Sequence, residues 1–192
     1  MSRRSDVNRK GQWLPGIAIA LAVSATFAGA GKQPVVEDGT LGFQLPDLAG
    51  RVVNSTDSQF TGRALLVEVW ATWCPPCVSE IPTLVELQKR YGDRGLVIVA
   101  IAFVAEDDEQ RRTRLREFVT KNGINYVVLD GGPPAESETA LPSLKNVRGF
   151  PVEILIDGKG RVAAARNGYG YKKKWAKKLN EEIEALLTET VQ

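Results

Sequence analysis

Two long apolar runs, at residues 64–70 and 96–103, constrain the fold of this 192-residue chain more than any other feature. Neither run alternates between apolar and polar positions, so both faces of the strands that they form must be covered. Apolar residues at helical spacing follow the first run, from Cys74 to about Gly92. Buried strands alternating with helices are typical of a central sheet with helices packed against it.

The remaining pattern predicts an α/β fold with a central mixed β-sheet flanked by helices. We expect three further strands and two further helices, with strands at 126–129, 152–156 and 162–166 and helices at 109–122 and 172–187. A strong hairpin signal, Asp-Gly-Lys-Gly, lies between the last two strands. The last helix is expected to bury four residues at helical spacing, namely Trp175, Leu179, Ile183 and Leu186.

Turn residues place smaller elements around these strands. An Ala-Gly turn separates apolar residues 43–48 from residues 51–53 and predicts an N-terminal β-hairpin. A Ser or Thr cap predicts a short helix over residues 55–60. Residues 131–141 begin with two glycines and two prolines and are expected to form a loop.

Residues 1–30 have the composition of an export segment. A basic start precedes an apolar run, and Ala-Gly-Ala at residues 28–30 is a small-x-small cleavage site. We expect residues 1–30 to be a signal peptide or, if uncleaved, an N-terminal membrane anchor, and a buried helix of the domain is the third alternative. Residues 31–40 are expected to be a linker and residues 41–188 the folded domain. Either export reading places the domain in the periplasm or another extracytoplasmic compartment, with membrane contact only through an uncleaved segment.

The composition excludes several kinds of chemistry. The chain has no histidine and only 2 cysteines, which removes catalytic triads, histidine-ligated metals and a four-ligand zinc site. No metal or cofactor is therefore expected. The net charge of +2 becomes −1 without residues 1–30, so nothing in the charge balance indicates a nucleic-acid partner.

Both cysteines lie where the first buried strand meets its helix, in Cys74-Pro75-Pro76-Cys77. A helix start leaves backbone N–H groups unpaired beside Cys74 and favours its thiolate form. Cys77, one turn into the helix, can then attack a mixed disulfide at Cys74. This arrangement predicts a redox-active disulfide with Cys74 as the attacking residue and Cys77 as the resolving residue. A stabilising disulfide, worth only about 2 kcal/mol for so short a loop, and a two-thiol metal site are the alternatives.

Residues 67–77 resemble the active-site signature of the thioredoxin superfamily, and more closely that of the exported TlpA/ResA-like thiol-disulfide oxidoreductases. The resemblance covers about residues 41–187. It includes the hairpin segment 43–48, the segment Gly149-Phe150-Pro151 and a helix-strand insert at 109–129. It implies a thioredoxin-like fold with an N-terminal hairpin and this insert.

The resemblance also implies where a substrate binds. Pro151 matches the family's cis-proline, which lies across from the cysteines and offers backbone groups to the substrate chain, although a strand-initiating proline is the alternative. Four neighbours are expected to contact substrate with it, namely Trp73, Pro75, Pro76 and Phe150. The chain departs from the pattern at Val152-Glu153, where relatives often carry Thr or Ser.

Glu68 is an anomaly in its apolar run. It lies six residues before Cys74, where thioredoxins keep a buried carboxylate that moves a proton for the second cysteine, whereas many TlpA-like proteins have a neutral residue there. An unpaired carboxylate in an apolar strand should have a raised pKa, which suits it to accept the proton of Cys77. An exposed position on a strand edge is the alternative.

These observations predict an exported thiol-disulfide oxidoreductase. The resemblance implies reduction of protein disulfides, as in cytochrome c or metal-site maturation, with electrons from a membrane thiol-disulfide donor. A peroxiredoxin-like peroxidase is one alternative, but it would carry Thr or Ser three residues before the reactive cysteine, where this chain has Ala71. A redox-inert thiol metallochaperone or binding module is the other.

Overall fold

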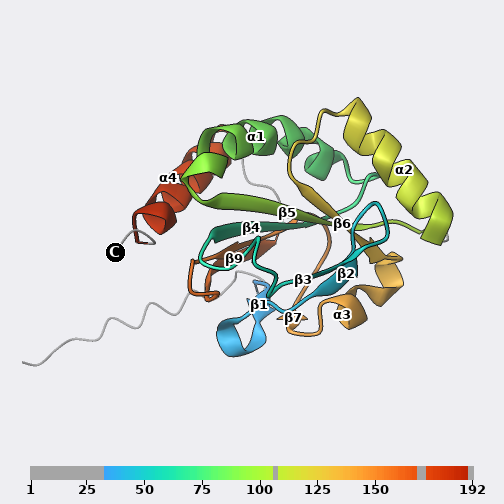
Figure 1. Cartoon of the computed structure of the whole chain (residues 1–192), viewed down its shortest axis with the longest axis horizontal. Helices are drawn as coiled ribbons and strands as arrows, with labels where there is room; N and C mark the ends of the chain where they lie inside the picture. The colour runs from blue at the N-terminus through green and yellow to red at the C-terminus, as the bar shows by residue number, and fades with distance from the viewer. Residues whose placement is uncertain (1–32, 106–107, 168–171, 190–192) are drawn as a thin grey trace, which may run out of the picture. The chain divides into compact units, whose positions relative to one another are not determined.

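A five-stranded mixed sheet forms the centre of the domain in this computed structural model, which describes residues 33–105, 108–167 and 172–189. The strands lie in the order β6-β5-β4-β8-β9 (Figure 1). They span Ala64–Trp70 (β4), Leu96–Phe103 (β5), Val127–Gly132 (β6), Val152–Ile156 (β8) and Val162–Asn167 (β9). β4, β5 and β6 run parallel, whereas β8 is antiparallel to β4 and β9 is antiparallel to β8. The predicted mixed sheet is therefore confirmed.

Three helices cover one face of this sheet (Figure 1). They are α1 (Pro75–Tyr91), which a 3-10 turn at Gly92–Arg94 extends, α2 (Asp108–Lys121) and α4 (Lys172–Glu189). The four residues that α4 was expected to bury are all buried. Tyr91 joins α1 to α4, because its hydroxyl group lies 2.8 Å from Asn180 Oδ1 and 2.7 Å from Glu184 Oε1.

The opposite face is covered by short elements. The predicted N-terminal hairpin is present as β2 (Gln44–Pro46) and β3 (Val52–Asn54). Its side chains pack on the alternate residues of β4 and β5, so that every residue of these two strands is buried. The absence of a polar face in residues 64–70 and 96–103 follows from this double burial.

The predicted short helix at residues 55–60 is wrong, because a series of turns occupies this segment. The Asp57 carboxylate accepts a hydrogen bond from the Asn54 N–H group at 3.0 Å, and the Phe60 N–H group bonds to the Asp57 carbonyl at 2.9 Å. These local bonds satisfy the backbone without a helix. Phe60 is buried against Phe43, with ring centroids 5.8 Å apart.

Two further segments differ from the prediction. β6 continues through Gly132, and the expected loop at 131–141 contains a 3-10 turn (Pro134–Glu136) and α3 (Ser137–Ala140). The described part of the expected linker belongs to the domain, because β1 (Val35–Val36) pairs with β7 (Leu144–Lys145) and a 3-10 turn (Glu37–Gly39) follows it. Val36 is buried in the core, which explains why this segment folds onto the domain.

The expected export segment, residues 1–30, lies outside the described residues. Among the helices that the structure describes, none combines the length and the apolar character needed to cross a membrane.

Candidate functional site

Cys74 and Cys77 form a disulfide bond at the start of α1. Cys74 is the N-cap residue of the helix, and its Sγ atom accepts a hydrogen bond from the Cys77 N–H group at 3.3 Å. The helix therefore begins at the cysteine pair as expected, and an N–H group of its first turn that has no partner within the helix donates to the Cys74 sulfur. Exposure does not distinguish the two cysteines, since 4% of Cys74 and 3% of Cys77 is exposed.

The residues expected to contact substrate lie around this disulfide. Pro75 and Pro76 are exposed within the turn, and Trp73 is 60% exposed directly before it. The half-buried Phe150 ring lies 5.9 Å from the Trp73 ring and stacks on Phe103. The Phe150–Pro151 peptide bond is cis, as the resemblance implied. Residues from two distant segments of the chain thus form one partly apolar surface beside the sulfur atoms.

Glu68 lies in the middle of β4 and is only 3% exposed. In the sheet register its neighbours are Ala100 of β5 and Glu153 of β8. The exposed-edge alternative is therefore wrong. Within the described residues, no N–H or hydroxyl group donates a hydrogen bond to either oxygen of the Glu68 carboxyl group.

Glu80, which the sequence analysis missed, faces Glu68 from α1. It follows Cys77 by one helical turn on the buried side of the helix. The carboxyl groups of Glu68 and Glu80 are close enough for each to act on the pKa of the other. Since a carboxylate cannot donate a hydrogen bond, a bond between these groups requires a proton on one of them.

Burial is the main cause of the proton affinity of this carboxyl pair. It raises the pKa of Glu68 well above its ordinary value, and the charges of Glu80 and Glu153 raise it further. Burial also raises the pKa of Glu80 to about 7. Burial of both groups therefore favours retention of a proton on the pair, and Glu80 shares the buried face of α1 with Cys77.

A second buried group of charges adjoins the carboxyl pair. The Glu153 carboxylate accepts hydrogen bonds from Arg166 and from Trp175 Nε1, the latter at 2.7 Å. Arg166 also contacts Glu182 at 2.6 Å. Burial raises the pKa of Glu153, while Arg166 and the Trp175 hydrogen bond oppose this change.

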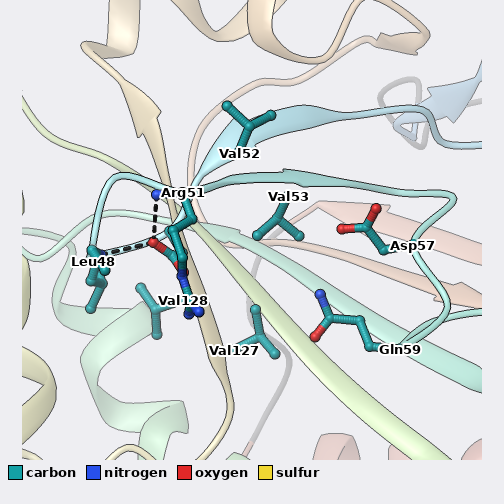
Figure 2. A pocket seen from close by; sticks show the side chains of 10 residues that line it. Leu48, Arg51, Val52, Val53, Asp57, Gln59, Val127 and Val128 are labelled. Carbon is teal, nitrogen blue, oxygen red and sulfur yellow. Dashed lines mark hydrogen bonds and ion pairs between the residues drawn. The ribbon is translucent and has the colours of Figure 1, made fainter.

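The largest pocket described lies elsewhere, between the β2–β3 turn and the edge strand β6 (Figure 2). Its volume is about 590 Å³, and its walls include Leu48, Val53, Val127 and Val128. Neither the cysteines nor the buried carboxyl groups line it.

The fold and the disulfide together define a thioredoxin-fold protein with a Cys-x-x-Cys centre. The Redoxin family model matches residues 32–183. The chain is 27% identical over 176 residues to the thioredoxin-like protein YneN of Bacillus subtilis, across 88% of this chain and 97% of that protein. It is 29% identical over 122 residues to the thiol-disulfide oxidoreductase ResA of Bacillus thuringiensis, across 62% of each chain.

A solved structure supports the same assignment. A thiol:disulfide interchange protein of the thioredoxin family from Chlorobium tepidum is similar with a TM-score of 0.61 at 26% identity, across 82% of this chain and 99% of that one. The chain therefore belongs to the Redoxin family, as a TlpA/ResA-like thiol-disulfide oxidoreductase of the thioredoxin superfamily.

The buried Glu68 carboxyl group should make stability depend on pH. A carboxyl group whose pKa is raised by folding has no effect below its unfolded pKa of about 4.3, and it costs increasing stability as the pH rises toward its folded pKa. Glu68→Gln removes this cost, which is about 1.4 kcal/mol for each pH unit by which folding raises the pKa. We expect the variant to have a higher urea midpoint than the wild type at pH 8 and to lose this advantage toward pH 4.

Urea unfolding at several pH values measures the difference. Glu86→Gln, an exposed position on the same helix as Glu80, is the matched control. A pH-independent difference between Glu68→Gln and the wild type would contradict the assignment of a raised pKa to Glu68.

Proposed function

We propose that this protein is exported and reduces disulfide bonds of extracytoplasmic proteins, with Cys74 as the attacking cysteine and Cys77 as the resolving cysteine. The observation that carries the proposal is the position of the pair at the start of α1. Cys74 caps the helix, whereas Cys77 shares the buried face of α1 with Glu80. The helix N-terminus favours a thiolate at Cys74, and the interior offers a proton acceptor for Cys77.

The proposed reaction is two successive thiol-disulfide exchanges. The Cys74 thiolate attacks one sulfur of the substrate disulfide, forms a mixed disulfide and releases the other substrate sulfur as a thiolate. The Cys77 thiolate then attacks the Cys74 sulfur, restores the Cys74–Cys77 disulfide and releases the second substrate thiolate. Two electrons pass to the substrate, and a membrane thiol-disulfide donor returns two electrons to the cysteines.

The carboxyl pair gives Cys77 a partner for its proton. Cys77 must lose its proton before it can attack, and it is buried away from bulk water. The ionised member of the Glu68–Glu80 pair accepts this proton as a general base. The proton returns to Cys77 when the donor reduces the disulfide again.

The surface around the disulfide suits an extended segment of a partner protein. Trp73 and Phe150 supply apolar contact area, and backbone groups at Pro151 are available to pair with the segment. We propose that the partners are proteins awaiting cytochrome c or metal-site assembly, because the TlpA/ResA-like group to which the chain belongs supports this class of substrate.

The two cysteines should behave differently in trapping experiments. Cys77→Ser should accumulate mixed disulfides with partner proteins, because the attack by Cys74 is retained and the resolving step is lost. Cys74→Ser should accumulate few or none. Non-reducing gels of the exported proteins measure both, and equal trapping by the two variants would show that the roles are not divided in this way.

The carboxyl pair should affect resolution more than attack. In Glu68→Gln and Glu80→Gln, the attack by Cys74 should stay close to the wild-type rate, while the release of the mixed disulfide slows by about tenfold or more. Stopped-flow measurements of single turnovers separate the two steps. Equal slowing of both steps, or of neither, would argue against proton transfer from Cys77 to the pair.

Export follows from the proposed signal in residues 1–30. When the full chain is produced in a bacterium, the domain should be found outside the cytoplasm. N-terminal sequencing distinguishes a chain cleaved after Ala30 from an anchored one. Recovery of full-length protein from the cytosol alone would refute export.

Two other functions make different predictions. A peroxiredoxin-like peroxidase would consume peroxide at Cys74, but Ala71 provides no hydroxyl group three residues before it and is fully buried. A metallochaperone would bind a metal through the two thiols without turnover. In an insulin reduction assay with dithiothreitol, a disulfide reductase accelerates precipitation of the insulin chains, whereas a metallochaperone does not.

A further inference from the structure

A row of three charged residues crosses the sheet beneath the helices. In the sheet register, Glu68 of β4 lies opposite Glu153 of β8, and Glu153 lies opposite Arg166 of β9. Directly paired residues of neighbouring strands point to the same face, with Cβ atoms about 5 Å apart. On the other side of Glu68, the β5 position is Ala100, which carries no charge. Within this row of the sheet, the charges near Glu68 are therefore those of Glu153 and Arg166, which both lie on its β8 side.

The elements packed over this row add the remaining polar groups. α1 supplies Glu80 and the cysteine pair, and α4 supplies Trp175 and Glu182. Tyr126, just before β6, is half-buried, and the charges of Glu68 and Glu80 act on its hydroxyl group. Arg166 thus binds Glu153 and Glu182 directly and acts on Glu68 through its charge.

The hydrogen bonds to Glu153 favour its ionised form, whose charge acts on the Glu68–Glu80 pair. Arg166 and the Trp175 indole both donate hydrogen bonds to its carboxylate. These donors fit an ionised carboxylate, which accepts hydrogen bonds and donates none. The negative charge of the ionised Glu153 favours retention of a proton on the carboxyl pair, whereas the positive charge of Arg166 opposes it.

We propose that Glu153 and Arg166 are positioning residues that set how many protons the Glu68–Glu80 pair holds, and thereby how readily Cys77 is deprotonated. This inference rests on the proton transfer in the proposed function. It adds that residues of β8 and β9 set the proton affinity of the Glu68–Glu80 pair. The negative charge of Glu153 and the positive charge of Arg166 have opposite effects on this affinity, and these effects partly cancel. Neither Glu153 nor Arg166 contacts the reacting sulfur atoms in this account, and both act only through the carboxyl pair.

The titration of the carboxyl pair tests this inference in the oxidised protein, where turnover plays no part. Carbon-13 NMR of the glutamate carboxyl groups reports the midpoint at which the pair loses its proton. Glu153→Gln should lower the midpoint by about one pH unit, because it removes a negative charge, while its amide oxygen can still accept the Trp175 hydrogen bond. Arg166→Met should raise the midpoint by a similar amount, because it removes the opposing positive charge.

Further variants separate charge from packing. Glu181→Gln, an exposed carboxyl position on α4, is the matched control and should leave the midpoint unchanged. Arg166→Lys keeps the positive charge and should stay close to the wild type. The double variant Glu153→Gln with Arg166→Met removes both charges, so its midpoint should lie between those of the two single variants. If Arg166→Met does not fold, Glu153→Gln and the double variant carry the test.

The sign of the shifts decides the outcome. A merely structural role would loosen the core in both single variants and move both midpoints in the same direction, toward that of an exposed carboxyl group. Shifts of equal sign, or no shift in Glu153→Gln, would overturn the inference.

The pH profile of mixed-disulfide resolution is the second readout, and it should move in the same direction as the midpoint of each variant. A midpoint that shifts as expected while this profile stays fixed would overturn the proposed proton transfer and leave the control of the carboxyl pair by Glu153 and Arg166 standing.

Discussion

The burial of β4 on both faces is the constraint on which the rest of the structure depends. Because every residue of Ala64–Trp70 is buried, the strand lies in the interior of the sheet, between β5 and β8. The chain can reach the surface only where this strand ends, and there it turns directly into α1. The cysteine pair lies at this turn, so the same geometry makes Cys74 the N-cap residue of α1 and places Cys77 in its first turn, with both side chains buried. The difference proposed between two chemically identical thiols is thus a consequence of strand burial.

The same burial makes the carboxyl groups costly and useful at once. An ionised carboxylate in an apolar interior is unfavourable. Burial therefore favours retention of a proton by Glu68 or Glu80. A single buried carboxyl group would be mostly protonated and a poor acceptor. Two groups that share a proton keep one acceptor oxygen available, and in our proposal the opposite charges of Glu153 and Arg166 set how tightly that proton is held. In the proposed mechanism, the stability lost at this position is the cost of a proton acceptor for Cys77.

The elements and motifs that consecutive residues determine could be predicted from the sequence. The contacts that depend on how the strands pair could not. Apolar runs identified the central strands, and the Cys-Pro-Pro-Cys turn identified the site together with Glu68. Glu80 was missed although it follows Cys77 by one helical turn, because an acidic residue on a helix is usually exposed. Arg166 was missed because its contact with Glu153 depends on the pairing of β8 with β9. The helix expected at residues 55–60 failed for a local reason, since the Asp57 side chain bonds to the backbone in place of a helical turn.

Because register assembles the charged row, the chemistry of the site depends on the folding of the whole sheet. Glu68 and Glu153 face each other only in the observed pairing of β4 with β8, and a slip of one residue would turn one of them to the opposite face. The row is then covered by α4, whose Trp175 and Glu182 complete the hydrogen bonds of Glu153 and Arg166. In a partly unfolded chain the carboxyl groups would return to water and lose their raised proton affinity, while the cysteines would lose the helix start. The proposed proton transfer and thiol reactivity therefore both require that β4, β8, β9 and the helices that cover them have packed into one core.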